Sequence, residues 1–234
     1  MEKRSPVSLP SIAGMASIDS VTLEVADITS ARRFYDTAFG LGPELQLRAS
    51  DAPTTGFRGF TLSLTVSQPA TASALIDAAL AAGARSLKPA AKSLWGFGGV
   101  VQAPDGTIWK VAASKKKNTG PATRDIDKVV LLLGAEDVGA SKRFYVDRSL
   151  IVARSFGRKY VEFETQSGAV TLGLYGRRAL AKDAGVDQGG SGSHRLIIGS
   201  DAGPFTDPDG FECETAPVGS AGATPRPAAT PIAH

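Results

Sequence analysis

The sequence has few of the residues that usually bind metals or form cross-links. It contains a single cysteine, Cys213, and two histidines, His194 and His234. One cysteine excludes an intramolecular disulfide framework and any cysteine-rich metal site, so we expect a reducing compartment. No basic neighbour would activate Cys213 as a nucleophile, and we interpret it as a buried core thiol. His234 ends a tail rich in Ala, Pro and Gly, which leaves His194 as the histidine of the folded chain.

Long hydrophobic runs are also missing. No apolar stretch approaches the roughly 20 residues that a membrane-spanning helix needs. The first 17 residues, which we interpret as a loose arm, lack the apolar core of a secretory signal. We therefore expect a soluble, cytoplasmic protein without membrane contact.

An excess of one charge is absent as well, with 26 Lys and Arg against 23 Asp and Glu. Most basic residues are interspersed with acidic ones, and the one cluster, at residues 115–117, is typical of a solvated linker. We expect no nucleic-acid partner. The sequence also lacks a G-x-S-x-G motif, a P-loop and a dinucleotide fingerprint, and the GFGG segment from Gly96 indicates a flexible loop.

What the sequence does contain is an internal repeat. Residues 20–42 (SVTLEVADITSARRFYDTAFGLG) return as residues 128–150 (KVVLLLGAEDVGASKRFYVDRSL). Each copy begins with apolar residues in the pattern of a half-buried strand and continues at helical spacing. Asp27 and Asp137 are the expected helix caps, and Gly40 supplies a left-handed residue that ends the first helix. Each copy therefore predicts a strand followed by an amphipathic helix.

A second repeated motif lies at the end of each half of the chain. APDGTIWK at residues 103–110 resembles DPDGFECE at residues 207–214, and both predict a turn that leads into a strand. We interpret the chain as a diverged tandem duplication. The expected organisation is an arm (1–17), a first domain (18–113), a linker (114–124), a second and shortened domain (126–215) and a disordered tail (216–234).

The elements between the repeats follow from local patterns. Alternation predicts strands near residues 45–48, 60–66 and 107–112, and helical spacing predicts a helix over 72–82. The second half predicts strands near 151–155, 159–164, 170–175 and 194–198, a short helix over 178–184 and a flexible segment at 186–193. It has no counterpart of the helix over 72–82 and is about thirty residues shorter by this alignment.

This order of elements, with an FY pair in each helix and a PDG turn before each last strand, resembles the vicinal oxygen chelate superfamily. That superfamily includes glyoxalase I, bleomycin-resistance proteins, extradiol dioxygenases and fosfomycin-resistance enzymes. The resemblance implies an α+β fold of tandem βαβββ modules, with curved mixed sheets that enclose ligand clefts. A fold of this kind does not by itself fix the function.

The resemblance also indicates where a catalytic metal would bind. In the first half, the matching positions are Ser20, the neighbourhood of residues 58–61, and Lys110, and none is a plausible ligand. In the second half they are Lys128, His194 and Glu214, which give two donors. We expect no cofactor. A divalent metal is the alternative, held by His194 and Glu214 together with one carboxylate from a set of three: Glu162, Glu164 and Glu212.

Two further interpretations of these residues stay open. Lys128 and Glu214 could form an ion pair that takes the place of a metal, with His194 beside it. Alternatively, His194 and Glu214 could act as catalytic acid and base groups inside a cleft.

Several aromatic and basic residues are candidates for ligand binding, because the resemblance places them at the border of a cleft. The alternative is that they pack in the core or at its rim. The candidates are Arg58, Trp95, Phe97, Trp109 and Lys110 in the first half and Tyr160 and Tyr175 in the second, with Phe57 and Arg177 as their neighbours.

The missing metal ligands favour a protein that binds or sequesters a small molecule without a catalytic metal. The first alternative is a lyase, isomerase or dioxygenase that uses His194 and Glu214. The second is a structural or interaction module with sealed clefts. We expect a small-molecule partner and a monomer or a homodimer.

Overall fold

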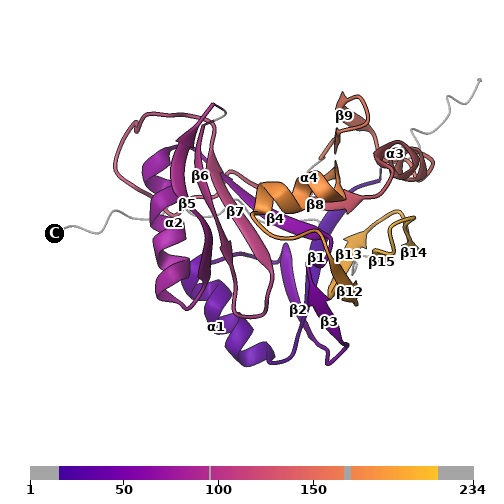
Figure 1. Cartoon of the computed structure of the whole chain (residues 1–234), viewed down its shortest axis with the longest axis horizontal. Coiled ribbons are helices and arrows are strands. Elements are labelled where there is room, and N and C mark those ends of the chain that lie inside the picture. Colours follow the sequence, from indigo (N-terminus) through magenta and orange to yellow (C-terminus); the bar gives the residue numbers. More distant parts are fainter. Residues whose placement is uncertain (1–15, 95, 166–169, 216–234) are drawn as a thin grey trace, which may run out of the picture.

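The structure is a computed structural model, and it describes residues 16–94, 96–165 and 170–215. The described residues form an α+β fold with two large mixed sheets, a short ribbon and four helices (Figure 1). Among them, no helix combines the length and the apolar character that crossing a membrane requires.

The first half contains two helices, and its elements are β1 (Ile18–Val25), α1 (Ile28–Ala38), β2 (Leu45–Ala49), β3 (Thr54–Gly56), β4 (Phe60–Val66), α2 (Pro69–Ala81), β5 (Arg85–Ser93), β6 (Gly96–Gln102) and β7 (Ile108–Ala113). The second half contains the other two helices, and its elements are β8 (Lys128–Ala135), α3 (Val138–Val146), β9 (Val152–Phe156), β10 (Tyr160–Phe163), β11 (Val170–Gly176), α4 (Arg177–Ala184), β12 (Gly190–Gly192), β13 (Leu196–Ser200), β14 (Phe205–Thr206) and β15 (Glu212–Thr215).

The strand and helix of each repeat are confirmed. The Asp27 carboxylate accepts from the first backbone N–H groups of α1, and the Asp137 carboxylate does the same for α3. Gly40 follows α1 with a φ of 59°, a left-handed conformation that glycine adopts without strain. In the described chain, β14 is the one element between β13 and β15, whereas α2, β5 and β6 lie between β4 and β7.

Each large sheet takes strands from both halves. The eight-stranded sheet has the order β5-β6-β7-β4-β8-β11-β10-β9, and its centre is the antiparallel pair of β4 and β8. The five-stranded sheet has the order β14-β15-β13-β1-β2, and β1 pairs antiparallel with β13. Within the halves, β4 pairs parallel with β7, and β13 pairs parallel with β15. These matching parallel pairs support the alignment of the two PDG turns. The pairs of β4 with β8 and of β1 with β13, in contrast, join strands from different halves.

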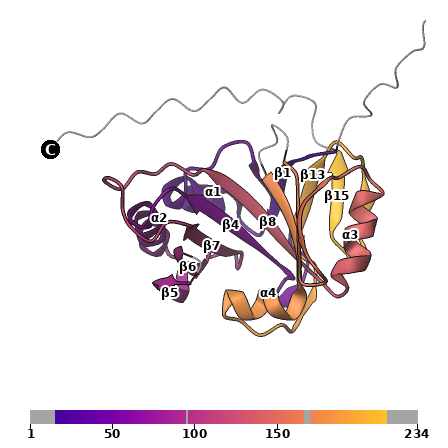
Figure 2. The same ribbon diagram turned by 90° about the horizontal axis from the view of Figure 1, so that it is seen from above.

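The two faces of the eight-stranded sheet are covered by different helices. Along β8, Leu131 and Leu133 belong to the main core, whereas Leu132 packs against a smaller cluster under α4. Along β7, Trp109 belongs to the main core and Ile108 to the smaller cluster. Because side chains alternate across a strand, α4 covers the face opposite the main core. Figure 2 shows α1 and α2 on one side of β4 and β8, and α4 on the other.

Two segments that the sequence indicated as flexible form strands instead. Residues 190–192 form β12, which pairs antiparallel with β3. Gly96 begins β6, which pairs with both β5 and β7. Glycine-rich composition suggested mobility, but here the absence of side chains lets neighbouring backbones approach closely.

In both repeats, a buried tyrosine of the helix donates a hydrogen bond to an aspartate of the PDG turn region. The Tyr35 hydroxyl donates to Asp105 over 2.6 Å, and the Tyr145 hydroxyl donates to Asp207 over 2.8 Å. Burial, reinforced by the neighbouring carboxylate, raises the pKa of both tyrosines well above the ordinary value. Each phenol therefore stays protonated and fastens its helix to the turn before the last strand.

Candidate functional site

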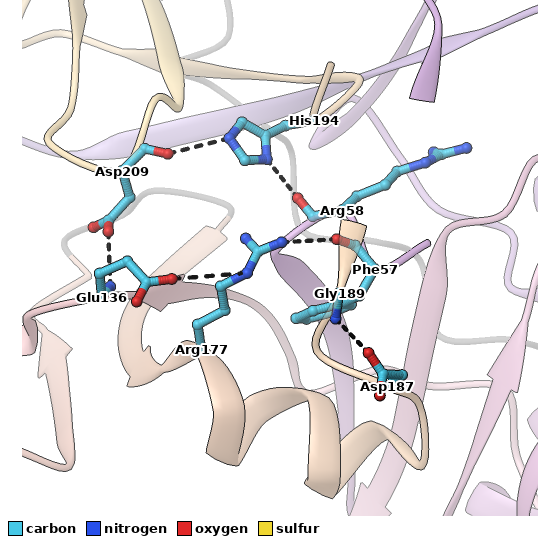
Figure 3. Close-up of polar contacts among 8 residues, drawn as sticks. All are labelled: Phe57, Arg58, Glu136, Arg177, Asp187, Gly189, His194 and Asp209. Atoms are coloured by element: carbon cyan, nitrogen blue, oxygen red, sulfur yellow. Dashed lines mark hydrogen bonds and ion pairs between the residues drawn. The ribbon is translucent and has the colours of Figure 1, made fainter. Parts of the chain in front are cut away.

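A polar pocket of about 490 Å³ opens at the N-terminal end of α4. It lies where the β3–β12 ribbon meets α4 and the segment before β13 (Figure 3). Both halves of the chain contribute to it. Its walls are formed by Thr54, Phe57, Arg58, Glu136, Arg177, Gln188, Gly189, Gly190, Ser191, Gly192, Ser193 and His194.

One wall of the pocket depends on glycine. A Cβ on Gly190 would lie 2.2 Å from the carbonyl oxygen of Phe57, and a Cβ on Gly56 would lie 2.3 Å from the carbonyl oxygen of Gly189. Both contacts are with backbone, so no side-chain movement could relieve them. The glycines thus allow the ribbon to close against the segment that carries Phe57.

Arg177 is the first residue of α4 and is held in place from two sides. Its Nη2 donates to the Phe57 carbonyl oxygen over 3.0 Å, and its guanidinium carbon lies 5.4 Å from the centre of the Phe57 ring. On the other side, its Nε lies 4.0 Å from a carboxylate oxygen of Glu136. The Arg177 side chain is 20% exposed and the Glu136 side chain 82%. The cation is therefore fixed, whereas the anion is free to move.

His194 joins two backbone segments. Its Nδ1 faces the carbonyl oxygen of Arg58, and its Nε2 lies 3.2 Å from the carbonyl oxygen of Asp209 (Figure 3). The imidazole also stacks on Phe211, with 4.0 Å between ring centroids. Carbonyl oxygens only accept, so the imidazole is a hydrogen-bond donor here, through one N–H when it is neutral and through both when it is protonated. This setting does not favour His194 as a metal ligand or a base.

Glu214 is engaged elsewhere. Arg48 makes a two-pronged contact with its carboxylate, with distances of 2.7 and 2.8 Å. The hydrogen bond from Arg48 lowers the pKa of Glu214. Glu214 is not among the residues that line the pocket of His194. The expected ion pair of Lys128 with Glu214 is wrong: Lys128 lies in the eight-stranded sheet and contacts Glu162 at 3.1 Å, whereas Glu214 lies in the five-stranded sheet.

The donor set does not fit a metal ion. Both nitrogens of His194 face carbonyl oxygens, and both oxygens of Glu214 face Arg48. Across residues 16–94, 96–165 and 170–215, no three His, Cys, Asp or Glu side chains are arranged to hold a metal.

The basic candidates for ligand binding have protein partners. The Arg58 guanidinium donates to the Asp105 carbonyl oxygen, so Arg58 contributes its own carbonyl to the pocket and directs its charge away from it (Figure 3). Burial lowers the pKa of Arg58. Lys110 forms an ion pair of 2.7 Å with Asp183 on α4.

The tyrosine candidates also contact protein groups. The Tyr160 hydroxyl donates to Glu162 over 2.8 Å, and burial raises the pKa of Tyr160 above its ordinary value. Tyr175 packs against the cluster under α4, with its ring 6.0 Å from that of Tyr160.

The remaining aromatic candidates are core residues where the structure describes them. Trp109 has no exposed surface and packs between Tyr35 and Phe39. Phe97 is partly buried against the same core. Trp95 lies outside the described residues.

Helix α4 covers the sheet face that carries Lys110. Leu180, Ala181 and Ala184 are buried against that face. At the C-terminal end of α4, Lys88 donates to the carbonyl oxygens of Lys182 and Asp183 over 2.8 and 2.6 Å. The open space is thus displaced to the N-terminal end of the helix, where Arg177 lies.

The sequence missed two parts of this pocket. Glu136 follows the strand of the second repeat and belongs to no motif that indicates a functional site. Residues 186–193 were expected to be flexible, although their glycines were a signal that backbone segments could pack closely there.

The similarity of this chain to known proteins lies in its structure. At the level of sequence, no family model and no curated protein matches the chain. Glyoxalase I from Zea mays matches the structure with a TM-score of 0.55 and 15% identity, over 85% of this chain and 91% of that chain. A glyoxalase/bleomycin resistance protein/dioxygenase family enzyme from Burkholderia phytofirmans matches with a TM-score of 0.38 and 18% identity, over 42% of this chain and 98% of that chain.

The match to glyoxalase I covers both halves and shows the fold. The chain therefore has a fold like that of glyoxalase I, and the likeness extends over both halves. Because unrelated activities share one fold, the function has to be argued from the site.

Proposed function

We propose that the protein binds a small anionic molecule in the pocket of Arg177 and His194, without a metal-dependent step. The observation that carries this proposal is the fixed guanidinium of Arg177 at the wall of a pocket of about 490 Å³. The enzymatic alternative, with His194 and Glu214 as an acid and base pair, lacks support because each residue is engaged with other partners.

Arg177 suits this role for two reasons. A guanidinium carries five N–H donors in one plane and matches the two oxygens of a carboxylate or phosphate. One donor is used on the Phe57 carbonyl oxygen, and this bond fixes the plane of the group. Since the side chain is already ordered, a ligand would lose little affinity to the entropy of ordering it.

His194 contributes shape and polarity rather than proton transfer. Its ring forms a wall of the pocket, stacked on Phe211, and its hydrogen bonds hold the Arg58 segment against the turn at Asp209. This arrangement keeps the Phe57 carbonyl oxygen, one residue earlier in the chain, in place for Arg177.

Replacing Arg177 with glutamine is expected to weaken anion binding strongly. The test is calorimetric titration with acetate, hexanoate, adipate and inorganic phosphate, supported by the shift in melting temperature. The wild-type protein should bind at least one of these anions, and Arg177→Gln should weaken that binding about tenfold or more, because charge-assisted hydrogen bonds contribute about 1.5–3 kcal/mol each.

The matched control is Arg32→Gln, which removes one positive charge from an exposed position on α1 that does not line the pocket of Arg177. It should bind as the wild type does. Equal affinity in wild type and Arg177→Gln, or no binding of any anion to the wild type, would overturn the proposed function.

Glu136→Gln is expected to have the opposite effect. The Glu136 carboxylate lies 4.0 Å from the Arg177 Nε and competes with an anionic ligand for the same cation. Removing its charge should tighten binding about two- to fivefold, because exposed ion pairs contribute about 0.2–1 kcal/mol. The same titration measures this, with Glu164→Gln as the control for loss of an exposed carboxylate outside the pocket. Weaker binding by Glu136→Gln would show that Glu136 contacts the ligand favourably.

A further inference from the structure

The pocket of Arg177 continues into a second one. The second pocket has a volume of about 400 Å³ and shares Glu136, Arg177 and Gln188 with the first. Its walls are formed by Ala135, Glu136, Gly176, Arg177, Arg178, Ala179, Lys182 and Gln188. The two pockets are therefore neighbouring parts of one groove around the first turns of α4.

Positive charge dominates the second pocket. Arg178 and Lys182 line it in addition to Arg177, and Glu136 is the one acidic residue among its walls. Arg178 and Lys182 are four residues apart on α4, so they lie on one face of the helix. Both are exposed, unlike Arg177. The helix beneath them is anchored by Lys88, which donates to the Lys182 carbonyl oxygen over 2.8 Å.

We propose that the second pocket is a subsite for a second anionic group, so that the ligand is an elongated dianion. This inference rests on the proposed function, because Arg177 has to hold the first anionic group. A helix rises about 1.5 Å per residue, so Lys182 lies about 7 Å along the axis from Arg177. The ligand class is a molecule with carboxylate or phosphate groups at two ends of a short chain.

The chemistry of the groove supports a dianion over a monoanion. A monoanion at Arg177 would leave Arg178 and Lys182 with only Glu136 as a counter-charge among the walls. A second anionic group would be attracted to both side chains at once. Because these two residues are exposed, the gain in affinity should weaken as salt is added.

The experiment is a calorimetric titration with dicarboxylates of increasing length, from malonate to pimelate, and with hexanoate as the monoanion. A parallel series of phosphonocarboxylates of the same lengths distinguishes a phosphate-type group from a carboxylate. In the wild type, the best dicarboxylate should bind about tenfold more tightly than hexanoate, with an optimum at glutarate, adipate or pimelate.

Two variants of α4 test the origin of this preference. In the double variant Arg178→Gln, Lys182→Gln, the affinity ratio of adipate to hexanoate should fall to about one. In the charge-conserving variant Arg178→Lys, Lys182→Arg, the ratio should stay high, which would rule out a general disturbance of the helix. Circular dichroism and melting temperature verify that both variants are folded.

The outcomes separate the two proposals. Equal binding of adipate and hexanoate to the wild type, with both lost in Arg177→Gln, would overturn the dianion subsite and leave the proposed function standing. A preference for adipate that persists in the double glutamine variant would also overturn the subsite. Binding that does not depend on Arg177 would overturn both.

Discussion

Replacing Trp109 with alanine is expected to destabilise the protein by about 3–5 kcal/mol, the range for removal of a large buried aromatic side chain. Trp109 has no exposed surface, and its ring lies 5.6 Å from that of Tyr35 and 5.0 Å from that of Phe39. Alanine would leave a cavity at the contact between β7 and α1. Urea denaturation followed by circular dichroism measures the loss, with Phe156→Ala as the comparison.

Phe156 is 64% exposed at the end of β9, so its truncation should change the free energy of unfolding by about 0.5 kcal/mol or less. Trp109→Ala should also leave the affinity of the folded fraction for adipate unchanged, because Trp109 does not line the groove. A loss of affinity without a loss of stability would contradict the core role and restore Trp109 as a ligand-binding residue.

The fold was largely predictable because its signals are local. Alternation of apolar residues identified β1, β4 and β8, and the Asp caps located the starts of α1 and α3. The pairing of β4 with β8 was not predictable in the same way, since a strand pattern shows which face is buried and not which strand lies beside it. β3 and β12 were missed because their glycines and small polar residues carry no apolar alternation.

The candidate site was only partly predictable, for a related reason. Arg177 and His194 could be named from the sequence, but their partners could not. Phe57 lies 120 positions from Arg177, and Arg58 lies 136 positions from His194. The resemblance suggested that His194 and Glu214 share a site, whereas the five-stranded sheet brings Glu214 to Arg48. Which residues meet in the pocket depends on the path of α4, and a helical pattern does not specify the sheet face that it covers.

Replacing Asp207 with alanine is expected to cost about 3 kcal/mol, since each buried polar group left unsatisfied costs about 1–3 kcal/mol. The Asp207 side chain accepts from the Tyr145 hydroxyl over 2.8 Å and from the backbone N–H groups of Asp209 and Phe211 over 2.9 and 2.8 Å. Tyr145 has no exposed surface, so its hydroxyl would find no replacement partner in water. Equilibrium unfolding in urea at neutral pH measures the effect.

Asp207→Asn separates the hydrogen bonds from the charge. The amide oxygen can still accept from the two backbone N–H groups, and the Tyr145 hydroxyl can rotate to accept from the amide. We therefore expect a smaller loss than in Asp207→Ala. Equal and small losses in both variants would contradict the role of Asp207 as the junction between α3 and the turn before β15.

The titration of Asp207 makes the free energy of unfolding depend on pH. Burial outweighs the hydrogen bonds and raises the pKa of Asp207 above its ordinary value of 3.8. The folded protein then holds this proton more tightly than the unfolded chain. The part of the stability that comes from this proton is therefore fully present below pH 3.8 and is lost as the pH rises through the raised pKa, whereas the hydrogen bonds of the Asp207 side chain remain. Asparagine does not titrate, so the cost of Asp207→Asn relative to the wild type should be largest at the acid end of this window and should decline as the pH rises. Unfolding curves of both proteins across the window provide the measurement, and a cost that grows with pH would show that the native hydrogen bonds favour the ionised carboxylate instead.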